Sequence, residues 1–365
     1  MELIKEIQDR GHEQVAIFHD PKSGLKGIVA IHNTVLGPAL GGCRMWNYAN
    51  ESEALVDVLR LSKGMTYKAA IAGLNLGGGK AVIIGNSKVE KTESLFRSFG
   101  RFVEGLGGRY ITAEDVGTSI RDMEYVRMET DYVTGISQAL GGSGDPSPVT
   151  AYGVFIGMKA CISKKMGKTN FEGLKIAIQG LGHVGMHLCK YLYDAGAKLY
   201  VTDIDPMIMG EAIEQFSASP VDPNEILNMD VDIYAPCALG ATIDEKTINQ
   251  LKCKIIAGAA NNQLAESTLG IELKKKGILY APDYAINAGG LINVSNELEG
   301  YNRERAFSQA EGIYETLMEI FYRSDSENIS TNRASDLQAE NRLNKIGELK
   351  SFYLPDKKTF KIQNA

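Results

Sequence analysis

The stretch Leu174-Lys-Ile-Ala-Ile-Gln-Gly180-Leu-Gly182-His-Val-Gly185 decides the fold of this chain. Its first half has the continuous apolar pattern of a buried strand, and the GxGxxG run that follows opens a helical pattern. A second strand pattern, residues 199–202, ends at Asp203. By itself GxGxxG is weak evidence, but strand, glycine turn, helix and strand in succession predict the βαβ unit that binds a dinucleotide.

The glycine turn is expected to hold the pyrophosphate of the dinucleotide, because free N–H groups point outward from the N-terminus of the following helix. Asp203 can accept hydrogen bonds from the ribose hydroxyls, and its charge would repel a 2′-phosphate. No Arg or Lys follows in Ile204-Asp205-Pro206, so the sequence favours NAD over NADP. The predicted cofactor-binding residues are Gly180, Leu181, Gly182, His183, Val184, Gly185 and Asp203.

Strand and helix patterns alternate on both sides of this unit, which predicts an α/β protein. At 365 residues the chain is too long for one compact core. The segment Gly141-Gly-Ser-Gly-Asp-Pro-Ser-Pro148 has the composition of a linker. We therefore expect an N-terminal α/β substrate and oligomerisation domain over residues 1–140 and a Rossmann domain over residues 141–325. Residues 326–365 are expected to pack on the first domain or on a neighbouring subunit.

Local patterns give the expected elements. Apolar residues at helical spacing predict helices over residues 51–63, 92–106, 119–128 and 299–323. Shorter apolar runs predict strands over residues 15–19, 25–32, 81–84 and 110–113. Residues 36–44 are too broken by glycine for either regular structure, so a loop is expected there.

A second informative stretch, Leu76-Gly-Gly-Gly-Lys80, delivers a lysine behind three glycines. The missing Cβ atoms let a backbone or a substrate approach closely. A lysine held against apolar chain is desolvated and can act as a base near neutral pH. A P-loop is excluded, because Leu74 stands where its first glycine would be and Ala81 replaces its Ser or Thr. From these residues alone, Lys80 is either a catalytic or anion-binding residue or part of an ordinary turn.

Polar residues at strand ends are further candidates for function. Asp115 follows the strand predicted over residues 110–113, at the position where open α/β sheets place functional side chains. The alternative is that Glu114 or Asp115 caps the next helix. Asn262 and Asn287 follow later strands and could hold a carboxamide or a carboxylate, although Asn is also an ordinary turn residue.

Composition and patterning exclude several other classes of function. The formal net charge is −6 and no basic stripe is interleaved with aromatic residues, which argues against nucleic acid. The polar N-terminus is no signal peptide, and no apolar run is long enough to span a bilayer. Five scattered cysteines indicate reduced thiols and a cytoplasmic protein. His183 and His187 have the spacing of metal ligands but fall within the predicted Rossmann helix, so we expect no metal.

Several motifs occur in an order that resembles the glutamate/leucine/phenylalanine/valine dehydrogenase family. They are Gly37-Pro-Ala-Leu-Gly-Gly-Cys-Arg44, Lys68, Leu76-Gly-Gly-Gly-Lys80, Ala113-Glu-Asp115-Val-Gly, the GxGxxG turn and Asn287-Ala-Gly-Gly290. The resemblance runs from about residue 10 to about residue 350. It implies reversible, NAD-dependent oxidative deamination of an L-amino acid to a 2-oxo acid and ammonium. It also implies a mostly parallel N-terminal sheet, a cleft between the domains that closes on substrate, and a homo-oligomer, commonly an octamer.

The resemblance also implies roles for individual residues. Lys80 matches the catalytic lysine, Lys68 the lysine that binds the substrate carboxylate, and Asp115 the aspartate that carries a proton to and from the amino nitrogen. Other matches are the Gly41-Gly42 backbone, which closes the carboxylate site, and Thr150 and Asn262, which lie near the nicotinamide and the substrate. These roles suit the chemistry, because the water that attacks an imine needs a base poised near neutral pH.

The side-chain pocket implied by the resemblance is apolar. Glutamate-specific relatives have a lysine and a serine where this chain has Leu40 and Val294, and the other positions expected to line the pocket are Met65, Ala113 and Leu291. Such a pocket leaves a substrate's distal carboxylate unpaired, so glutamate should be rejected. Valine has one methylene fewer than leucine and its isomer isoleucine, a difference worth about 1–3 kcal/mol, so mixed branched-chain use is expected.

Three alternatives remain open from sequence. Phenylalanine is a possible substrate, because the depth of the pocket is not visible. A 2-hydroxy acid enzyme would pair a histidine base with a carboxylate, and none of the five histidines stands at a suggestive strand end. A non-catalytic NAD-binding regulator would be expected to lack Lys80 or Asp115, and both are present.

Overall fold

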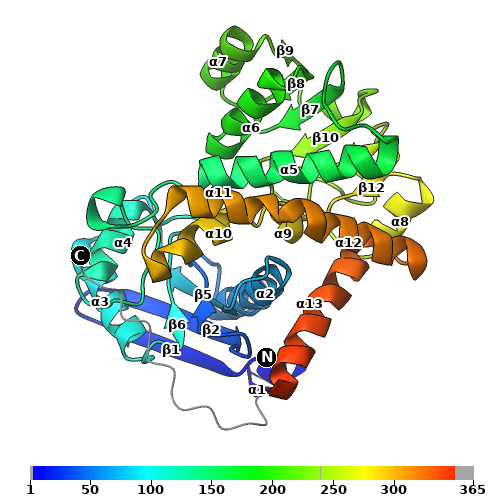
Figure 1. Cartoon of the computed structure of the whole chain (residues 1–365). Coiled ribbons are helices and arrows are strands. Elements are labelled where there is room, and N and C mark those ends of the chain that lie inside the picture. Colours follow the sequence, from blue (N-terminus) through cyan, green and yellow to red (C-terminus); the bar gives the residue numbers. More distant parts are fainter. Residues whose placement is uncertain (1–2, 239, 350–365) are drawn as a thin grey trace. The chain divides into compact units, whose positions relative to one another are not determined.

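The computed structural model describes residues 3–238 and 240–349, which form two compact units (Figure 1). Unit 1 contains the described parts of residues 1–145, 294–303 and 339–365. Unit 2 contains those of residues 146–293 and 304–338. The chain passes from unit 1 to unit 2 between Asp145 and Pro146, inside the glycine-rich segment 141–148, and returns between Asn293 and Val294. It crosses again between Arg303 and Glu304 and between Gln338 and Ala339.

Unit 1 is built on a sheet whose strands follow the order β1-β2-β5-β3-β6, with β4 also paired to β5. The strands are β1 (Gln14–Asp20), β2 (Leu25–Asn33), β3 (Ala39–Leu40), β4 (Cys43–Trp46), β5 (Gly77–Ile84) and β6 (Tyr110–Ile111). β2 runs antiparallel to both β1 and β5, whereas β3 and β4 run parallel to β5, and β6 parallel to β3. The sheet is therefore mostly parallel, with β2 reversed.

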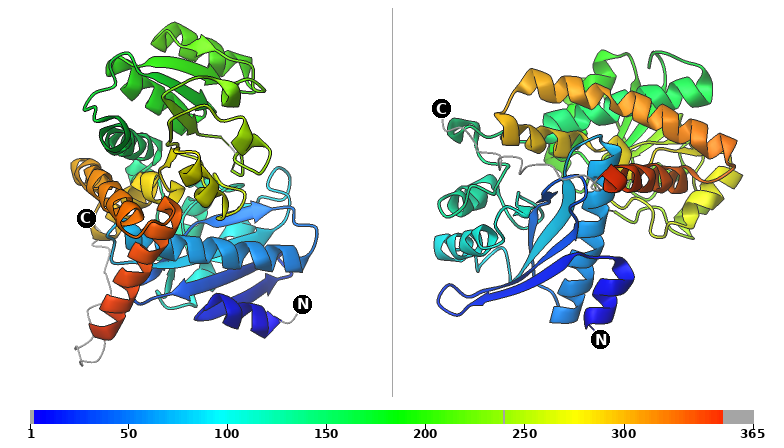
Figure 2. Two further views of the ribbon diagram at one scale, coloured as in Figure 1. Left: turned by 90° about the vertical axis from the view of Figure 1, so that its right-hand side faces the viewer. Right: turned by 60° about the horizontal axis from the view of Figure 1, so that its bottom comes forward.

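Helices cover both faces of this sheet (Figures 1 and 2). The helices are α1 (Leu3–Arg10), α2 (Glu51–Ile71), α3 (Glu93–Glu104), α4 (Ile120–Arg127) and the short 3-10 turn η1 (Gln138–Leu140). α2 lies on one face, and α3 and α4 lie on the other. Asn50, Thr92 and Ser119 cap the N-termini of α2, α3 and α4 with their side chains. Ser119 thus caps α4, and the alternative that Glu114 or Asp115 does so is wrong.

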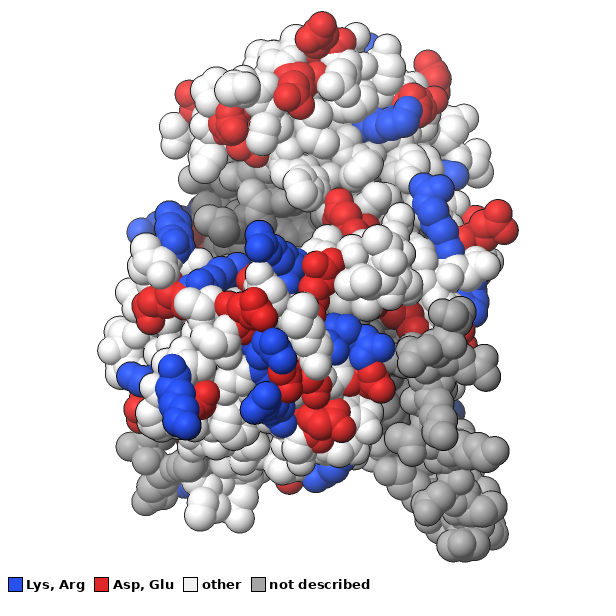
Figure 3. Space-filling model, turned by 90° about the vertical axis from the view of Figure 1, so that its left-hand side faces the viewer, with Lys and Arg blue, Asp and Glu red and all other residues white. Residues whose placement is uncertain are grey.

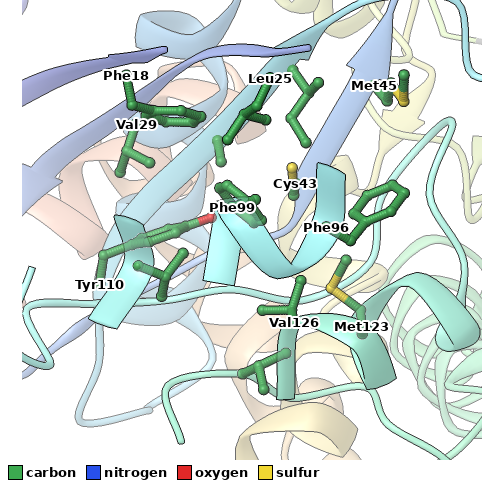
Figure 4. Packing of buried hydrophobic residues seen from close by; sticks show 14 of the residues in the cluster. Phe18, Leu25, Val29, Cys43, Met45, Phe96, Phe99, Tyr110, Met123 and Val126 are labelled. Carbon is green, nitrogen blue, oxygen red and sulfur yellow. The ribbon is translucent and has the colours of Figure 1, made fainter. Parts of the chain in front are cut away.

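The alternation of β5 divides the core of unit 1 into two layers. Ala81 and Ile83 join the aromatic cluster under α3 and α4, where Phe96, Phe99 and Tyr110 are fully buried (Figure 4). Val82 joins the smaller cluster under α2. Because successive side chains of a strand point to opposite faces, Lys80 lies on the α2 side together with Val82.

Two expectations for this region are wrong. Residues 36–44 are not a plain loop, because β3 and the start of β4 fall within them and pair alongside β5. The predicted strand 81–84 begins earlier, at Gly77, so the glycines lie inside β5 rather than in a turn. In both cases partners distant in sequence supply the ladder of hydrogen bonds that the local sequence does not predict. Helix α2 also continues beyond residue 63 to Ile71 and therefore carries Lys68.

Unit 2 is built on a parallel sheet with the strand order β12-β11-β10-β7-β8-β9. The strands are β7 (Lys175–Gln179), β8 (Lys198–Thr202), β9 (Ser219–Pro220), β10 (Ile233–Pro236), β11 (Ile255–Ile256) and β12 (Leu279–Tyr280). This is the doubly wound arrangement that the GxGxxG context predicts, and the predicted α/β class is confirmed.

The helical elements from α5 onward are α5 (Ser147–Met166), α6 (His183–Asp194), α7 (Pro206–Phe216), α8 (Leu269–Lys275), α9 (Asp283–Ile286), α10 (Gly289–Ser295), α11 (Arg303–Glu311), α12 (Ile313–Ser326) and α13 (Thr331–Glu348), with short 3-10 turns η2 (Ile226–Asn228), η3 (Thr247–Asn249) and η4 (Asn296–Glu299). The single helix predicted over residues 299–323 is wrong. It is two helices that meet at Gly312, where the flexible backbone of glycine weakens a continuous helix.

The last described helix, α13, contacts α2 within unit 1. Arg342 donates hydrogen bonds to the carbonyls of Ala70, Gly73 and Leu74 at 2.8–3.0 Å, so it caps the C-terminal end of α2. Ala339 and Leu343 add an apolar contact to the same end of that helix. Beyond Leu349, the C-terminal part of the segment predicted over residues 326–365 lies outside the described residues.

Candidate functional site

Lys80 and Asp115 meet on the α2 side of the sheet in unit 1. The Nζ atom of Lys80 lies 3.1 Å from Oδ1 of Asp115. The Lys80 side chain is 6% exposed and that of Asp115 is 22% exposed, so the lysine is buried and the carboxylate half-buried. Lys80 is held by β5, and Asp115 follows β6, two strands that are separated by β3 in the sheet. The sheet therefore brings a buried lysine and a carboxylate into contact.

Arg44 holds the other oxygen of the same carboxylate. Its Nε donates to Oδ2 of Asp115 at 2.9 Å, and its Nη1 donates to Oδ2 of Asp57 on α2 at 2.9 Å. Asp57 also accepts hydrogen bonds from Tyr48 at 2.8 Å and from Arg60 at 3.1 Å. Sequence reasoning quoted Arg44 within a motif but gave it no role, and Asp57 was missed because nothing local marks it.

Burial and charge act in opposite directions on Asp115. Burial favours the neutral carboxyl, but the positive charges and hydrogen bonds of Lys80 and Arg44 together hold its pKa below the ordinary value of 3.8. The carboxylate is therefore ionised at neutral pH. The charged form of Arg44 is favoured as well. The two carboxylates beside it raise its pKa, although burial opposes this shift.

The three glycines before Lys80 make close contacts within unit 1. A Cβ atom on Gly77 would stand 2.0 Å from the backbone oxygen of Asn33. On Gly78 it would stand 2.1 Å from the nitrogen of Thr66, and on Gly79 it would stand 2.7 Å from the ring of Tyr110. The close approach of backbone that the sequence predicts is thus present, and the neighbours are the protein's own strand, helix and ring.

Gly41 and Gly42 lie between β3 and β4, beside the strand that carries Lys80. A Cβ on Gly41 would stand 1.8 Å from the oxygen of Gly79. One on Gly42 would stand 2.3 Å from the oxygen of Glu114 and 2.9 Å from Cβ of Asp115. Only glycine at position 42 lets the segment that carries Asp115 come this close to the sheet.

The remaining predicted substrate residues of unit 1 lie near these glycines, on α2 or, for Val294, on α10. Met65 is adjacent to Gly41, since its Cγ would stand 3.3 Å from a Cβ there. Leu40 and Ala113 are buried, at 1% and 7% exposed. Lys68, on the same helix as Met65, is half-buried, as is Val294.

In unit 2, the three glycines of the GxGxxG turn have three different surroundings. Gly180 has φ +102°, a backbone conformation that side chains rarely adopt. A Cβ on Gly185 would stand 2.1 Å from the oxygen of Gly180, so this glycine lets α6 approach the turn. Gly182 has nothing within 4 Å of its Cβ position. An open face at the middle glycine, ahead of the N-terminus of α6, fits the pyrophosphate of a dinucleotide.

Asp203 connects the end of β8 to the glycine turn. Its Oδ2 accepts a hydrogen bond from the backbone of Leu181 at 2.6 Å, and its Oδ1 accepts one from Asp205 at 3.0 Å. A carboxylate has about four acceptor positions, so Asp203 can still accept bonds from a ribose. Of the other predicted cofactor residues, His183 begins α6 and Val184 follows it.

Thr150 and Asn262 also lie in unit 2. Thr150, in the first turn of α5, is adjacent to Gly290, where a Cβ would stand 2.8 Å from the threonine Oγ1. Asn262 is exposed and has φ +52°, in the left-handed region. The loop that carries Asn262 is tied by the buried side chain of Asn287, whose amide donates to the oxygens of Ala259 and Asn261 at 3.0 and 2.8 Å. Leu291, on α10, is 6% exposed.

Glu297 is a buried carboxylate that sequence reasoning missed. It lies in η4 and accepts hydrogen bonds from the nitrogens of Gly135 and Ser143 at 2.9 and 2.8 Å, and from the hydroxyl of Ser143. Burial raises its pKa, although these donors oppose the shift. Glu297 thus joins the two segments of unit 1 that lie next to the chain crossings at residues 145 and 294.

Other kinds of site find little support. Within residues 3–238 and 240–349, there is no group of three or more His, Cys, Asp or Glu side chains placed to hold a metal ion. None of the described helices is long and apolar enough to cross a membrane. On the face in Figure 3, Lys and Arg are interleaved with Asp and Glu over much of the surface.

Comparison with known proteins places these features in a family. Residues 12–132 match the "Glu/Leu/Phe/Val dehydrogenase, dimerisation domain", and residues 141–212 and 204–347 match "Glutamate/Leucine/Phenylalanine/Valine dehydrogenase". A leucine dehydrogenase from Bacillus cereus is 55% identical over 354 residues, which cover 97% of both chains. A phenylalanine dehydrogenase from Bacillus thermotolerans is 47% identical and covers 94% of this chain and 91% of its own.

A solved structure, that of L-tryptophan dehydrogenase from Nostoc punctiforme, matches with a TM-score of 0.84 at 47% identity. It covers 94% of this chain and 99% of its own. A Rossmann unit and a second α/β unit with a buried lysine–aspartate pair define a nicotinamide-dependent oxidoreductase, and the chain belongs to the glutamate/leucine/phenylalanine/valine dehydrogenase family. It is an amino-acid dehydrogenase, as the sequence predicted.

Proposed function

We propose that this enzyme catalyses the reversible, NAD-dependent oxidative deamination of branched-chain L-amino acids, with leucine as a principal substrate. The observation that carries the proposal is the contact between Lys80 and Asp115 on the α2 side of the sheet in unit 1. A base and a proton carrier are thereby in contact, and the residues that we assign to the side-chain pocket, such as Leu40 and Ala113, are apolar. The 55% identity to a leucine dehydrogenase supports the same substrate class.

The residues of unit 1 would act in sequence on the substrate. Lys68 on α2 binds the α-carboxylate as a compact point charge, and the Gly41-Gly42 backbone closes that site. Lys80 takes a proton from the water that attacks the imine carbon. Asp115, 3.1 Å from Lys80, exchanges a proton with the amino nitrogen as ammonium leaves.

The residues of unit 2 would hold the cofactor. The open face at Gly182 and the N-terminus of α6 receive the pyrophosphate, Asp203 receives the adenosine ribose, and Thr150 and Asn262 approach the nicotinamide. NAD, when bound, accepts the hydride from the substrate Cα. The carboxylate of Asp203 disfavours the 2′-phosphate of NADP.

The substrate preference follows from the cost of burying charge. A glutamate side chain against Leu40, Met65 and Ala113 would leave its carboxylate without a partner, at a cost of several kcal/mol. The binding energies of leucine, valine and isoleucine should differ by no more than about 1–3 kcal/mol in such a pocket, so all three should be used. We therefore assign the enzyme to the catabolism of branched-chain amino acids. Phenylalanine is the alternative, which a relative of 47% identity supports. A non-catalytic NAD-binding regulator is disfavoured by the intact Lys80–Asp115 pair.

The test is the rate of formation of the reduced cofactor, NADH from NAD or NADPH from NADP, with leucine, valine, isoleucine, phenylalanine and glutamate as separate substrates. We expect turnover with the three branched-chain substrates and NAD, and none with glutamate. If phenylalanine gives the highest kcat/KM, the alternative replaces the proposal. If none of the five is oxidised, the proposed reaction is wrong.

We further propose that the enzyme is a homo-oligomer, because residues 12–132 match a dimerisation domain. Light scattering would measure its mass and test whether it is an octamer. We assign the enzyme to the cytoplasm, since all five cysteines are free thiols, as expected in a reducing compartment.

A further inference from the structure

Arg44 is placed on the side of β4 that faces α2. Cys43 and Met45 belong to the aromatic cluster on the opposite face, so alternation directs Arg44 toward α2 and the Lys80–Asp115 pair. Its side chain is 21% exposed and joins two carboxylates, Asp115 and Asp57, at 2.9 Å each. An arginine this buried between two aspartates is unlike an ordinary surface ion pair.

The two oxygens of Asp115 have different partners. Oδ1 lies 3.1 Å from Lys80, and Oδ2 accepts from Arg44. The terminal torsion of an aspartate is broad, so a carboxylate with a single partner can rotate about its Cβ–Cγ bond. A guanidinium bond to Oδ2 removes that freedom and leaves Oδ1 directed at Lys80.

Asp57 keeps Arg44 in place from the other side. It accepts from Arg44 and Tyr48 on one oxygen and from Arg60 on the other. Burial disfavours the ionised form of Asp57, but these hydrogen bonds and the charge of Arg44 hold its pKa below the ordinary value. Arg44 is therefore fixed between two anions, one anchored on α2 and one beside the proposed base.

We propose that Arg44 is a positioning residue of this enzyme, which holds the carboxylate of Asp115 in one orientation against Lys80, with Asp57 as its anchor. This inference rests on the proposed function of the Lys80–Asp115 pair. It assigns to the last residue of Gly37-Pro-Ala-Leu-Gly-Gly-Cys-Arg44 a role in setting the proton chemistry of Asp115.

The charges around Asp115 determine the direction in which each substitution should shift its pKa. Lys80 from β5 and Arg44 from β4 favour the carboxylate. Asp57 on α2, which Arg44 bridges to Asp115, acts against the carboxylate as a like charge. Cys43, Tyr48 and Tyr110 also face it, and they are neutral because burial raises the pKa of each. Loss of Arg44 should therefore raise the pKa of Asp115, and loss of the Asp57 charge should lower it.

The decisive experiment compares Arg44→Met, Arg44→Lys and Asp57→Asn in the full-length enzyme. The pH profile of kcat/KM with leucine is measured together with KM for leucine and the affinity for NAD. For Arg44→Met we expect kcat to fall on the order of tenfold. Its acidic limb, which reports proton loss from the coupled Lys80–Asp115 pair, should move up by about one pH unit because the pair loses a neighbouring positive charge, with NAD affinity unchanged. Arg44→Lys restores the position of the limb but not the full kcat, because an ammonium cannot bridge both carboxylates in a planar fork.

Asp57→Asn should shift the acidic limb in the opposite direction to Arg44→Met. It keeps Arg44 and Tyr48 in place but removes the charge that offsets Arg44, so the acidic limb should move to lower pH while kcat falls only severalfold. A loss of packing alone would lower the activity of both variants. It would not shift the acidic limb upward in Arg44→Met and downward in Asp57→Asn. If Arg44→Met fails to fold, this downward shift still tests the proposal, and an unmoved limb in Asp57→Asn overturns it.

Arg97 supplies the matched control, since it also joins two carboxylates, Glu93 and Glu129, but lies on α3. Arg97→Met should leave the pH profile and kcat unchanged. An active wild-type enzyme with an unmoved limb in Arg44→Met overturns the role of Arg44 alone. A wild-type enzyme that oxidises no amino acid overturns the proposed function instead, so the two failures are distinguishable.

Discussion

Gly78 on β5 lies directly against Thr66 on α2, so that a Cβ atom on the glycine would stand 2.1 Å from the threonine nitrogen. The contact joins the strand that carries Lys80 to the helix that carries Lys68. Gly78 is therefore needed for the strand and the helix to pack together at this point. The contact helps to set the positions of the two lysines relative to each other.

Gly78→Ala should destabilise unit 1 strongly, because neither the strand nor the helix can move without disturbing its own hydrogen bonds. We expect a loss of about 1–3 kcal/mol or more in the free energy of unfolding, measured by urea denaturation. Gly64→Ala on the same helix is the control. Nothing lies within 4 Å of a Cβ there, so alanine should stabilise the helix by about 0.5–1 kcal/mol. Equal effects of the two substitutions would contradict this packing account.

Lys80→Ala should abolish turnover, with kcat lowered by about 10²–10⁴-fold, while NAD affinity stays within about twofold of the wild type. NAD binding is followed by fluorescence titration. Lys91→Ala is the control, since Lys91 also pairs with a partly buried aspartate, Asp122, but belongs to no proposed site. Loss of NAD binding in Lys80→Ala would show that the lysine serves the cofactor rather than the substrate.

Gly182→Val should weaken NAD binding without loss of stability, because the space at its Cβ is open in the protein and is the space proposed for the pyrophosphate. Gly185→Val should do the reverse and lower the melting temperature, since its Cβ would stand 2.1 Å from the oxygen of Gly180. Calorimetric titration with NAD and thermal unfolding without it separate the two effects. A stable Gly182→Val protein with unchanged NAD affinity would refute the proposed position of the cofactor.

Two histidines should make the protein sensitive to mild acid. Burial lowers the pKa of both His12 and His32 to about 4, and their rings lie 4.8 Å apart. Between about pH 6.5 and about pH 4 the unfolded chain binds more protons at these positions than the folded one, so the free energy of unfolding falls as the pH falls. The loss attributable to His32 is at most about 3 kcal/mol.

Urea unfolding at pH 7, 6, 5 and 4.5 measures this slope. His32→Asn should be less stable at pH 7 but should lose less stability on acidification. His19→Asn, at an exposed histidine on β1, should leave the slope unchanged. A wild-type slope of zero across this range would contradict the assignment of neutral, buried imidazoles.

Glu297→Ala should destabilise unit 1 by about 1–3 kcal/mol or more, because the nitrogens of Gly135 and Ser143 would lose their acceptor inside the protein. Glu297→Gln retains one acceptor oxygen and should cost less. Glu299→Ala, at an exposed position of the same turn, should change stability by no more than about 0.5 kcal/mol. Urea denaturation of the three variants decides the matter.

Much of this architecture could be predicted because its signals are local. The GxGxxG turn has its strand and helix beside it in sequence, and the apolar period of α3 is complete within one segment. β3 and β4 could not be predicted, since glycines interrupt them and their hydrogen bonds come from β5 and β6. The roles of Arg44 and Glu297 could not be predicted for a related reason, because their partners lie 71 and 154 residues away in the sequence. The role of such a charged residue can be assigned only once the folded structure shows which partner it contacts.

The bond from Leu181 to Asp203 affects any attempt to change the cofactor of this enzyme. Replacing Asp203 by a small neutral residue, to admit a 2′-phosphate, would also remove the acceptor that ties the glycine turn to β8. The proposed preference for NAD and the order of the turn are therefore coupled through one side chain. A redesign toward NADP should begin from Asp203→Asn, which gives up the charge but keeps an oxygen for Leu181, and add a basic residue afterwards.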